Sequence, residues 1–173
     1  MATKQYVSPE SIEEIAQEIL DDAEVDTTEP GSVDTVKLAN FLDSTVNIVQ
    51  FSLEEVFVRA KRGPKGTDNL IEISSDADDE HQRFSIAHGL SHLILHCDKE
   101  FVEYRRPLLY YNDQKALLKE IQANVLAAAI LMPNHKKLVA RAWKNTQDIG
   151  DLAAMFNVSV VTAYYRLDNL GLL

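Results

Sequence analysis

The chain has 173 residues, enough for one domain with a sizeable hydrophobic core. Its formal net charge of −10 excludes a surface built throughout for nucleic acid, although a local basic patch stays possible. The single cysteine, Cys97, excludes an internal disulfide, and no apolar run approaches membrane-spanning length, so we expect a cytoplasmic protein without membrane contact.

Two amphipathic helices are predicted at the start of the chain. Residues 8–23 begin with Ser and Pro, carry Ser11 and Glu14 at capping-box spacing, and then repeat apolar residues on one face. After a loop, residues 33–45, VDTVKLANFLDST, are predicted to form a second helix.

Three strands follow these helices. The segments VNIVQFS, EEVFVRA and NLIEISS are rich in β-branched and aromatic residues, which favours strands. Residues 61–68, KRGPKGTD, form a hairpin loop between the last two, so we expect a small antiparallel sheet.

From about Asp79 onward the chain is predicted to be entirely helical, which makes the fold class α+β. Pro133 ends one helix because proline cannot continue the hydrogen-bond ladder. Residues 97–113 form a long connection with several aromatic residues. The predicted helices cover residues 79–96, 114–132, 134–143, 147–156 and 159–170.

The segment RFSIAHGLSHLILH carries His88 and His92 four residues apart. On a helix this spacing places both imidazoles on one face, where they can reach the same metal ion. By spacing alone, two unrelated histidines on a half-buried helix are the simpler interpretation. His96 continues the step but lies about 12 Å along the helix from His88, too far for the same ion, so we expect it to donate a hydrogen bond at the helix end.

A third ligand is predicted in the segment EIQANVLAAAILMP, where Glu120 and Asn124 share one helix face among small apolar residues. An unpaired carboxylate on such a helix costs several kcal/mol to bury, so Glu120 needs a cation nearby. Asn124 would then bind the other nitrogen of a ligating imidazole. An exposed Glu at the helix margin is the alternative interpretation.

These two segments together resemble the ImmA/IrrE family of bacterial and phage zinc endopeptidases. The family pattern is close to RFTIAHELGHLLLH followed by E-x-x-A-N-x-F-A-A-x-L-L-MP. The resemblance extends to IEEIAQEIL and VDTVKLANFL near the start and to residues 151–173 at the end.

The resemblance implies that His88, His92 and Glu120 bind zinc, that a water occupies the fourth position, and that Asn124 supports a ligand. It also implies a mostly helical zincin-like domain over residues 1–133, with residues 134–173 packed on it as a helix-turn-helix-like segment. Family members cleave helix-turn-helix repressors, of the XRE type, that control a phage, a mobile element or a stress response.

The chain departs from the family at Gly89, where the family has the Glu of H-E-x-x-H. That Glu takes a proton from the water and delivers it to the leaving amine. Because it is not a ligand, we expect zinc binding to survive while hydrolysis falls by at least roughly 10²–10⁴. Glycine inside a helix costs about 0.5–1 kcal/mol relative to alanine, so no gain in stability is evident.

A second departure is Ser91, where the family usually has Gly. Two changes favour a natural pseudoenzyme that occupies its repressor over an engineered inactive variant. The alternative is a working endopeptidase with a replacement base, but Ser91 faces away from position 89 at 100° per residue. Nothing in the sequence places Asp98, Glu100 or Glu103 at the zinc.

Residues 134–173 hold five cations and three carboxylates, a mild positive excess. We interpret this segment as a packing or partner-recognition element and do not expect it to bind DNA directly. The aromatic and leucine side chains of FVEYRRPLLYY would suit docking of the repressor.

Overall fold

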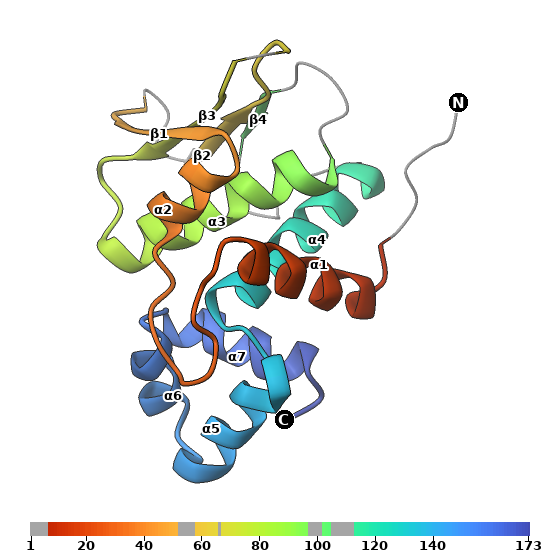
Figure 1. The fold of residues 1–173 in the computed structure, drawn as a ribbon, viewed down its shortest axis with the longest axis vertical. Coiled ribbons are helices and arrows are strands. Elements are labelled where there is room, and N and C mark those ends of the chain that lie inside the picture. Colours follow the sequence, from red (N-terminus) through yellow and green to blue (C-terminus); the bar gives the residue numbers. More distant parts are fainter. Residues whose placement is uncertain (1–6, 52–57, 66, 97–101, 105–112) are drawn as a thin grey trace.

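The computed structural model describes residues 7–51, 58–65, 67–96, 102–104 and 113–173, with the backbone alone for 102–104. A small sheet lies at one end, helices occupy the middle, and the C-terminal helices form the other end (Figure 1). The elements are α1 Pro9–Asp22, α2 Thr35–Phe41, β1 Ser44–Val49, β2 Val58–Lys61, β3 Asn69–Ser74, α3 Asp79–Leu95, β4 Val102–Tyr104, α4 Gln114–Leu131, the 3-10 turn η2 His135–Lys137, α5 Leu138–Thr146, α6 Ile149–Phe156 and α7 Val160–Asn169.

The α+β class is confirmed, and the helix boundaries follow local chemistry. Asp78 caps α3 and Asp113 caps α4, each accepting a backbone N–H of the first turn. α4 ends at Leu131, two residues before Pro133. The capping prediction for α1 was wrong in detail, because Ser8, not Ser11, is the N-cap residue and Pro9 takes the first helical position.

The sheet is mixed, which corrects the predicted antiparallel sheet. Its strand order is β1-β3-β2-β4, and the predicted hairpin of β2 and β3 is antiparallel. β1 pairs with β3 in parallel, with Val46 opposite Ile71. The alternation of residues within a short strand reveals which side chains are buried but not which neighbour lies beside it, so the direction of β1 was not predictable.

The region after Asp79 is not entirely helical, because β4 pairs antiparallel with β2 inside the predicted connection 97–113. The rest of that connection, including Cys97 and most of the aromatic segment, lies outside the described residues. The basic loop 61–68 connects β2 to β3 as predicted.

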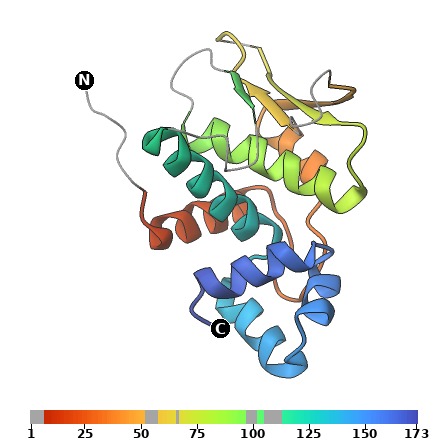
Figure 2. The ribbon, with the colours of Figure 1, turned by 180° about the vertical axis from the view of Figure 1, so that it is seen from behind.

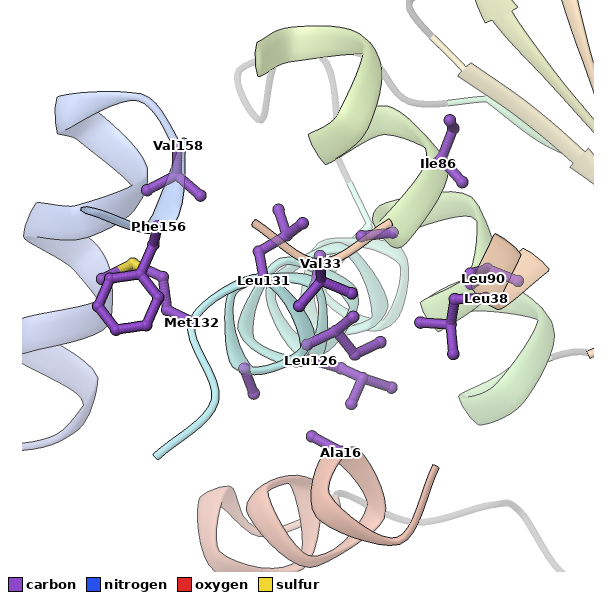
Figure 3. Packing of buried hydrophobic residues seen from close by; sticks show 14 of the residues in the cluster. Ala16, Val33, Leu38, Ile86, Leu90, Leu126, Leu131, Met132, Phe156 and Val158 are labelled. Carbon is purple, nitrogen blue, oxygen red and sulfur yellow. The ribbon is translucent and has the colours of Figure 1, made fainter. Parts of the chain in front are cut away.

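The core is organised around α4, which packs against α3, α1 and α7. Figure 3 shows α4 in the centre, with Ala16 of α1 on one side, Leu90 of α3 on another, and Phe156 beside Met132. Ala123 and Ala127 are completely buried, and such small side chains let neighbouring helices approach closely. The core is therefore continuous from the sheet-covering helix α3 to the C-terminal helices.

The C-terminal segment is tied to the rest of the chain by Arg166 of α7. This side chain is fully buried and binds both carboxylate oxygens of Glu13, with 2.8 Å between Arg166 Nη2 and Glu13 Oε2. Its Nε also donates to the carbonyl of Met132 at 3.0 Å. Residues 134–173 thus share a core with the preceding residues, while a domain division at residue 133 stays a prediction.

In the described part of the chain, no single helix has the length and apolar composition needed to cross a membrane. By length and composition alone, α4 and the segment His135–Thr146 would together be long and apolar enough to cross a membrane, but they are bent by 57° relative to each other.

Replacing Arg166 with methionine tests the link between α7 and α1. We expect the free energy of unfolding to fall by about 3 kcal/mol, at the low end for a broken buried ion pair, because 33% of the Glu13 side chain is exposed. Urea unfolding followed by circular dichroism measures this change. Arg141→Met, at an exposed arginine, is the control and should change stability by less than about 0.5 kcal/mol; equal effects would contradict the assignment.

Candidate metal centre

Helix α3 places two imidazoles side by side. His88 and His92 lie one turn apart, as their spacing predicts, and their Nε2 atoms are 3.0 Å from each other. The two rings meet edge to face, with 4.6 Å between ring centroids. Both side chains are completely buried, with exposed fractions of 0% and 1%. The helix therefore directs two nitrogen ligands toward one point inside the protein.

Helix α4 brings the carboxylate of Glu120 to the same point. Glu120 Oε2 lies 3.3 Å from His88 Nε2, and Oε1 lies 3.1 Å from His92 Nε2. The carboxylate is 1% exposed, so the alternative of a solvent-exposed Glu at the helix margin is excluded. The three side chains that the sequence singled out as ligands are brought together by the packing of α3 on α4.

The carboxylate of Glu120 is held in its charged form. Burial by itself would raise its pKa, but the hydrogen bonds from His88 and His92 and the charge of these rings outweigh that effect and lower the pKa to about 2. A buried carboxylate of this kind requires a cationic or hydrogen-bonding partner, and here the two imidazoles face it.

The geometry of the three side chains fits a divalent metal ion. Tetrahedral zinc with bonds of about 2.0–2.1 Å has ligand atoms about 3.3 Å apart, close to the 3.0, 3.1 and 3.3 Å that separate these atoms. In the described part of the chain, they form the one group of three His, Cys, Asp or Glu side chains close enough to share an ion. Two imidazoles and one carboxylate are a ligand set that zinc accepts.

His96 lies outside this cluster and donates a hydrogen bond, as predicted. Its Nε2 is 3.0 Å from the carbonyl of Lys119, the residue before Glu120. Burial and the neighbouring His92 lower the pKa of His96 to about 4, so the ring stays neutral at pH 7. His96 thus fixes the end of α3 against the turn of α4 that carries Glu120.

The predicted support from Asn124 stays a prediction. Asn124 is on the same helix as Glu120, one turn further along. Its Oδ1 and the Nδ1 of His92 are buried, and neither atom has a hydrogen-bond partner among the described residues. A protonated Nδ1 and a carbonyl oxygen are complementary, but the structure records no bond between them.

Gly89 faces the sheet, against side chains of strands β2 and β3. A Cβ atom at this position would lie 3.0 Å from Ile71 Cγ2 and 3.3 Å from Val58 Cγ2. Both contacts are tighter than ordinary van der Waals separations, so a larger residue would require Ile71 or Val58 to move. The expectation that Gly89 brings no gain in stability stays a prediction, because the response of Ile71 and Val58 to an added Cβ decides the sign of the effect.

Ser91 has its own hydrogen-bond partner. It is completely buried, and its hydroxyl donates to the carbonyl of Ala87 at 2.7 Å, one turn back in α3. The hydroxyl is thus engaged with the helix backbone. The side chains of Asp98, Glu100 and Glu103 lie outside the described residues.

The sequence analysis missed the roles of two arginines that join helices distant in the chain. Arg83, on α3, donates to the carbonyls of Val33, at 3.1 Å, and Asn157, and so joins the histidine helix to the turn between α6 and α7. Arg166 was counted only as one of five cations in the C-terminal segment, although it lies four and three residues after the buried Thr162 and Ala163 of the same helix. That spacing was the signal that could have identified it as buried.

A buried His-His-Glu cluster on two packed helices is the kind of site found in metal-dependent peptidases. Residues 43–168 match the model of a protein family described as "IrrE N-terminal-like domain". The match spans well over half of the chain, which therefore belongs to this family of metallopeptidase-like domains.

Two curated relatives carry the name "Radiation response metalloprotease IrrE". The protein of Deinococcus radiodurans is 34% identical over 101 residues, which cover 57% of this chain and 30% of that protein. The protein of Deinococcus deserti is 33% identical over 101 residues, covering 57% and 36%. The chain therefore spans about a third of the length of the curated relatives that it matches.

A solved structure described as a Mycobacterium tuberculosis transcriptional regulator has a similar fold. The TM-score is 0.63 at 16% sequence identity, and the match covers 95% of this chain and 48% of the other. At this identity the likeness concerns the fold alone.

Adding Zn²⁺ to chelator-stripped protein tests the cluster as a metal site. At a free Zn²⁺ concentration of about 100 times Kd, we expect the free energy of unfolding to increase by about 2.7 kcal/mol and Tm to rise by about 5–10 °C. His92→Ala and Glu120→Ala should each abolish this rise, whereas His81→Ala, at an exposed histidine of the same helix, should retain it. Scanning calorimetry and metal analysis provide the measurements, and an equal rise in His92→Ala would rule out these ligands.

The packing role of Gly89 predicts an unusual response to alanine. Alanine normally stabilises a helix relative to glycine by about 0.5–1 kcal/mol, but here its Cβ would press on Ile71. We expect Gly89→Ala to lower the free energy of unfolding by about 1 kcal/mol or more.

Ile71→Leu, which moves the branch away from Cβ, should reduce the cost of Gly89→Ala. A double-mutant cycle measured by urea unfolding should give a coupling of at least about 0.5 kcal/mol. A stabilising Gly89→Ala, or a cycle without coupling, would show that Ile71 does not restrict this position.

Proposed function

We propose that this chain is an ImmA/IrrE-like zinc-binding protein that acts on a helix-turn-helix transcriptional repressor of the XRE type. It acts by binding the repressor, as an anti-repressor, with its peptidase activity lost or strongly impaired. The observation that carries this proposal is the buried convergence of His88, His92 and Glu120 on a helix that has glycine at position 89.

Zinc is the metal that best fits the ligand set. Imidazole nitrogens and a carboxylate oxygen suit Zn²⁺, whereas Mg²⁺ and Ca²⁺ prefer oxygen ligands alone. When bound, zinc would supply Lewis-acid polarisation of a carbonyl group. The contribution of the chain itself is to hold His88 and His92 in one orientation through α3, with Glu120 fixed opposite them by α4.

Loss of catalysis is supported by the absence of a proton acceptor at position 89. Peptide hydrolysis needs a group that takes a proton from the attacking water and passes it to the leaving amine. Glycine has no such group, and the hydroxyl of Ser91 is bonded to the carbonyl of Ala87.

The repressor as partner follows from the family resemblance, since members act on helix-turn-helix repressors of phages, mobile elements and stress responses. The curated relatives are named as radiation response metalloproteases. A protein that retains the binding surface but lacks the base would still sequester such a repressor.

An active zinc endopeptidase is the second candidate, and the complete set of ligands favours it. In that case either Gly89 is an engineered replacement or another group serves as the base. The two candidates differ in one measurable respect, which is whether the repressor is cleaved.

Incubating the zinc-loaded protein with the repressor encoded beside its gene separates the candidates. We expect a stable complex by size-exclusion chromatography and no fragments by mass spectrometry. Gly89→Glu should then cleave the repressor at least about 10²–10⁴ times faster. Gly89→Gln is the matched control, because glutamine has a similar size but cannot accept the proton.

Because Gly89→Glu must fit beside Ile71, it is also made together with Ile71→Leu, and both proteins are checked for zinc binding. Clean cleavage by the unmodified protein would establish the endopeptidase and remove the anti-repressor proposal. A protein that neither binds nor cleaves this repressor would remove both.

A further inference from the structure

The two C-terminal helices carry a concentrated apolar surface. Of the ten large apolar side chains that are exposed in the described part of the chain, five lie on α6 and α7. We call this set the α6–α7 face, and it consists of Met155, Val160, Val161, Tyr164 and Tyr165, with exposed fractions between 42% and 63%. Single exposed apolar residues need no explanation, but a cluster on neighbouring helices marks an interaction surface.

Helical periodicity explains why α7 has this face. Its inner side is formed by Thr162, Ala163, Arg166 and Leu167, all buried. The residues between them point outward, and Tyr164 and Tyr165 stack edge to face with 5.6 Å between ring centroids. Figure 2 shows α7 on the side of the molecule turned to the viewer, far from the sheet.

The charge of residues 147–173 argues against DNA, which is the usual partner of a helix-turn-helix segment. In residues 147–173 the only lysine or arginine is Arg166, which is buried and bound to Glu13. The other four cations of the C-terminal segment lie before α6, on η2 and α5. Within α6 and α7 the exposed charges are carboxylates, on Asp151 and Asp168, and the half-buried Arg83 of α3 is bound to the carbonyl of Asn157 in the turn between these helices. A helix without free cations cannot neutralise DNA phosphates.

We propose that the α6–α7 face docks onto the DNA-reading surface of a helix-turn-helix repressor. This inference rests on the proposed function and specifies its contact surface. A DNA-reading surface carries lysine and arginine side chains that contact phosphates, around a helix that reads bases. An apolar and aromatic face flanked by Asp151 and Asp168 complements such a basic surface in charge.

The same charges disfavour the other occupants of this face. A second copy of this chain would bring acidic residues against acidic residues, in a protein with a net charge of −10. For a basic partner, the acidic residues accelerate association, while buried Tyr and Val side chains stabilise the complex. Because the partner surface is the one that binds DNA, docking and operator binding exclude each other.

The experiment measures binding of the full chain to the purified repressor encoded beside its gene. Val161→Ser/Tyr165→Ser should weaken binding at least tenfold by biolayer interferometry. Val36→Ser/Phe41→Ser is the matched control, since it removes one β-branched and one aromatic residue exposed on α2, and it should bind as the unmodified protein does. Circular dichroism and zinc binding confirm that both variants are folded.

Two further measurements test the chemistry of the contact. Asp168→Lys should slow association with the repressor, and the rate for the unmodified protein should fall as salt increases. In fluorescence anisotropy with labelled operator DNA, the unmodified protein should release the DNA from the repressor, and Val161→Ser/Tyr165→Ser should not.

The outcomes distinguish this inference from the proposed function. If the unmodified protein does not bind the repressor at all, the proposed function fails. If it binds and both double variants bind equally well, the α6–α7 face is not the contact. A ternary complex with operator DNA, direct DNA binding by the chain, or a dimer in sedimentation that Val161→Ser/Tyr165→Ser dissociates would each overturn the proposed docking.

Discussion

The structure depends on the packing of α3 against α4, because this contact places one carboxylate between two imidazoles in the protein interior. Glu120 lies 3.3 Å from one imidazole nitrogen and 3.1 Å from the other, and all three side chains are buried. Burying a carboxylate is costly unless it has partners. His96 strengthens the arrangement by bonding α3 to the carbonyl next to Glu120. The cluster is therefore both a candidate metal site and a constraint on how the two helices meet.

Gly89 connects this site to the sheet. This residue has no side chain, and an added Cβ would lie 3.0 Å from Ile71 Cγ2 and 3.3 Å from Val58 Cγ2. A glutamate introduced at position 89 would therefore require Ile71 or Val58 of the sheet to move. The anti-repressor proposal rests on the combination of three candidate metal ligands with a glycine at position 89.

The C-terminal helices are held by the polar contacts of two arginines, one buried and one half-buried. Arg166 joins α7 to α1, and Arg83 joins α3 to the turn before α7. Since Arg166, the one cation of α7, is buried, the outward face of α7 is left apolar and acidic. The same sequence pattern that suggested a helix-turn-helix therefore has a surface suited to a protein partner.

The sequence by itself determined the elements that depend on neighbouring residues. Helical periodicity and Pro133 located the helices, and the four-residue spacing paired His88 with His92. Glu120 could be predicted as the third candidate ligand because a carboxylate on an apolar helix needs a cation nearby. Only the tertiary structure decided the parallel pairing of β1, the close contact at Gly89 and the burial of Arg166. These features arise between segments distant in the chain, where local pattern carries no information about which surfaces meet.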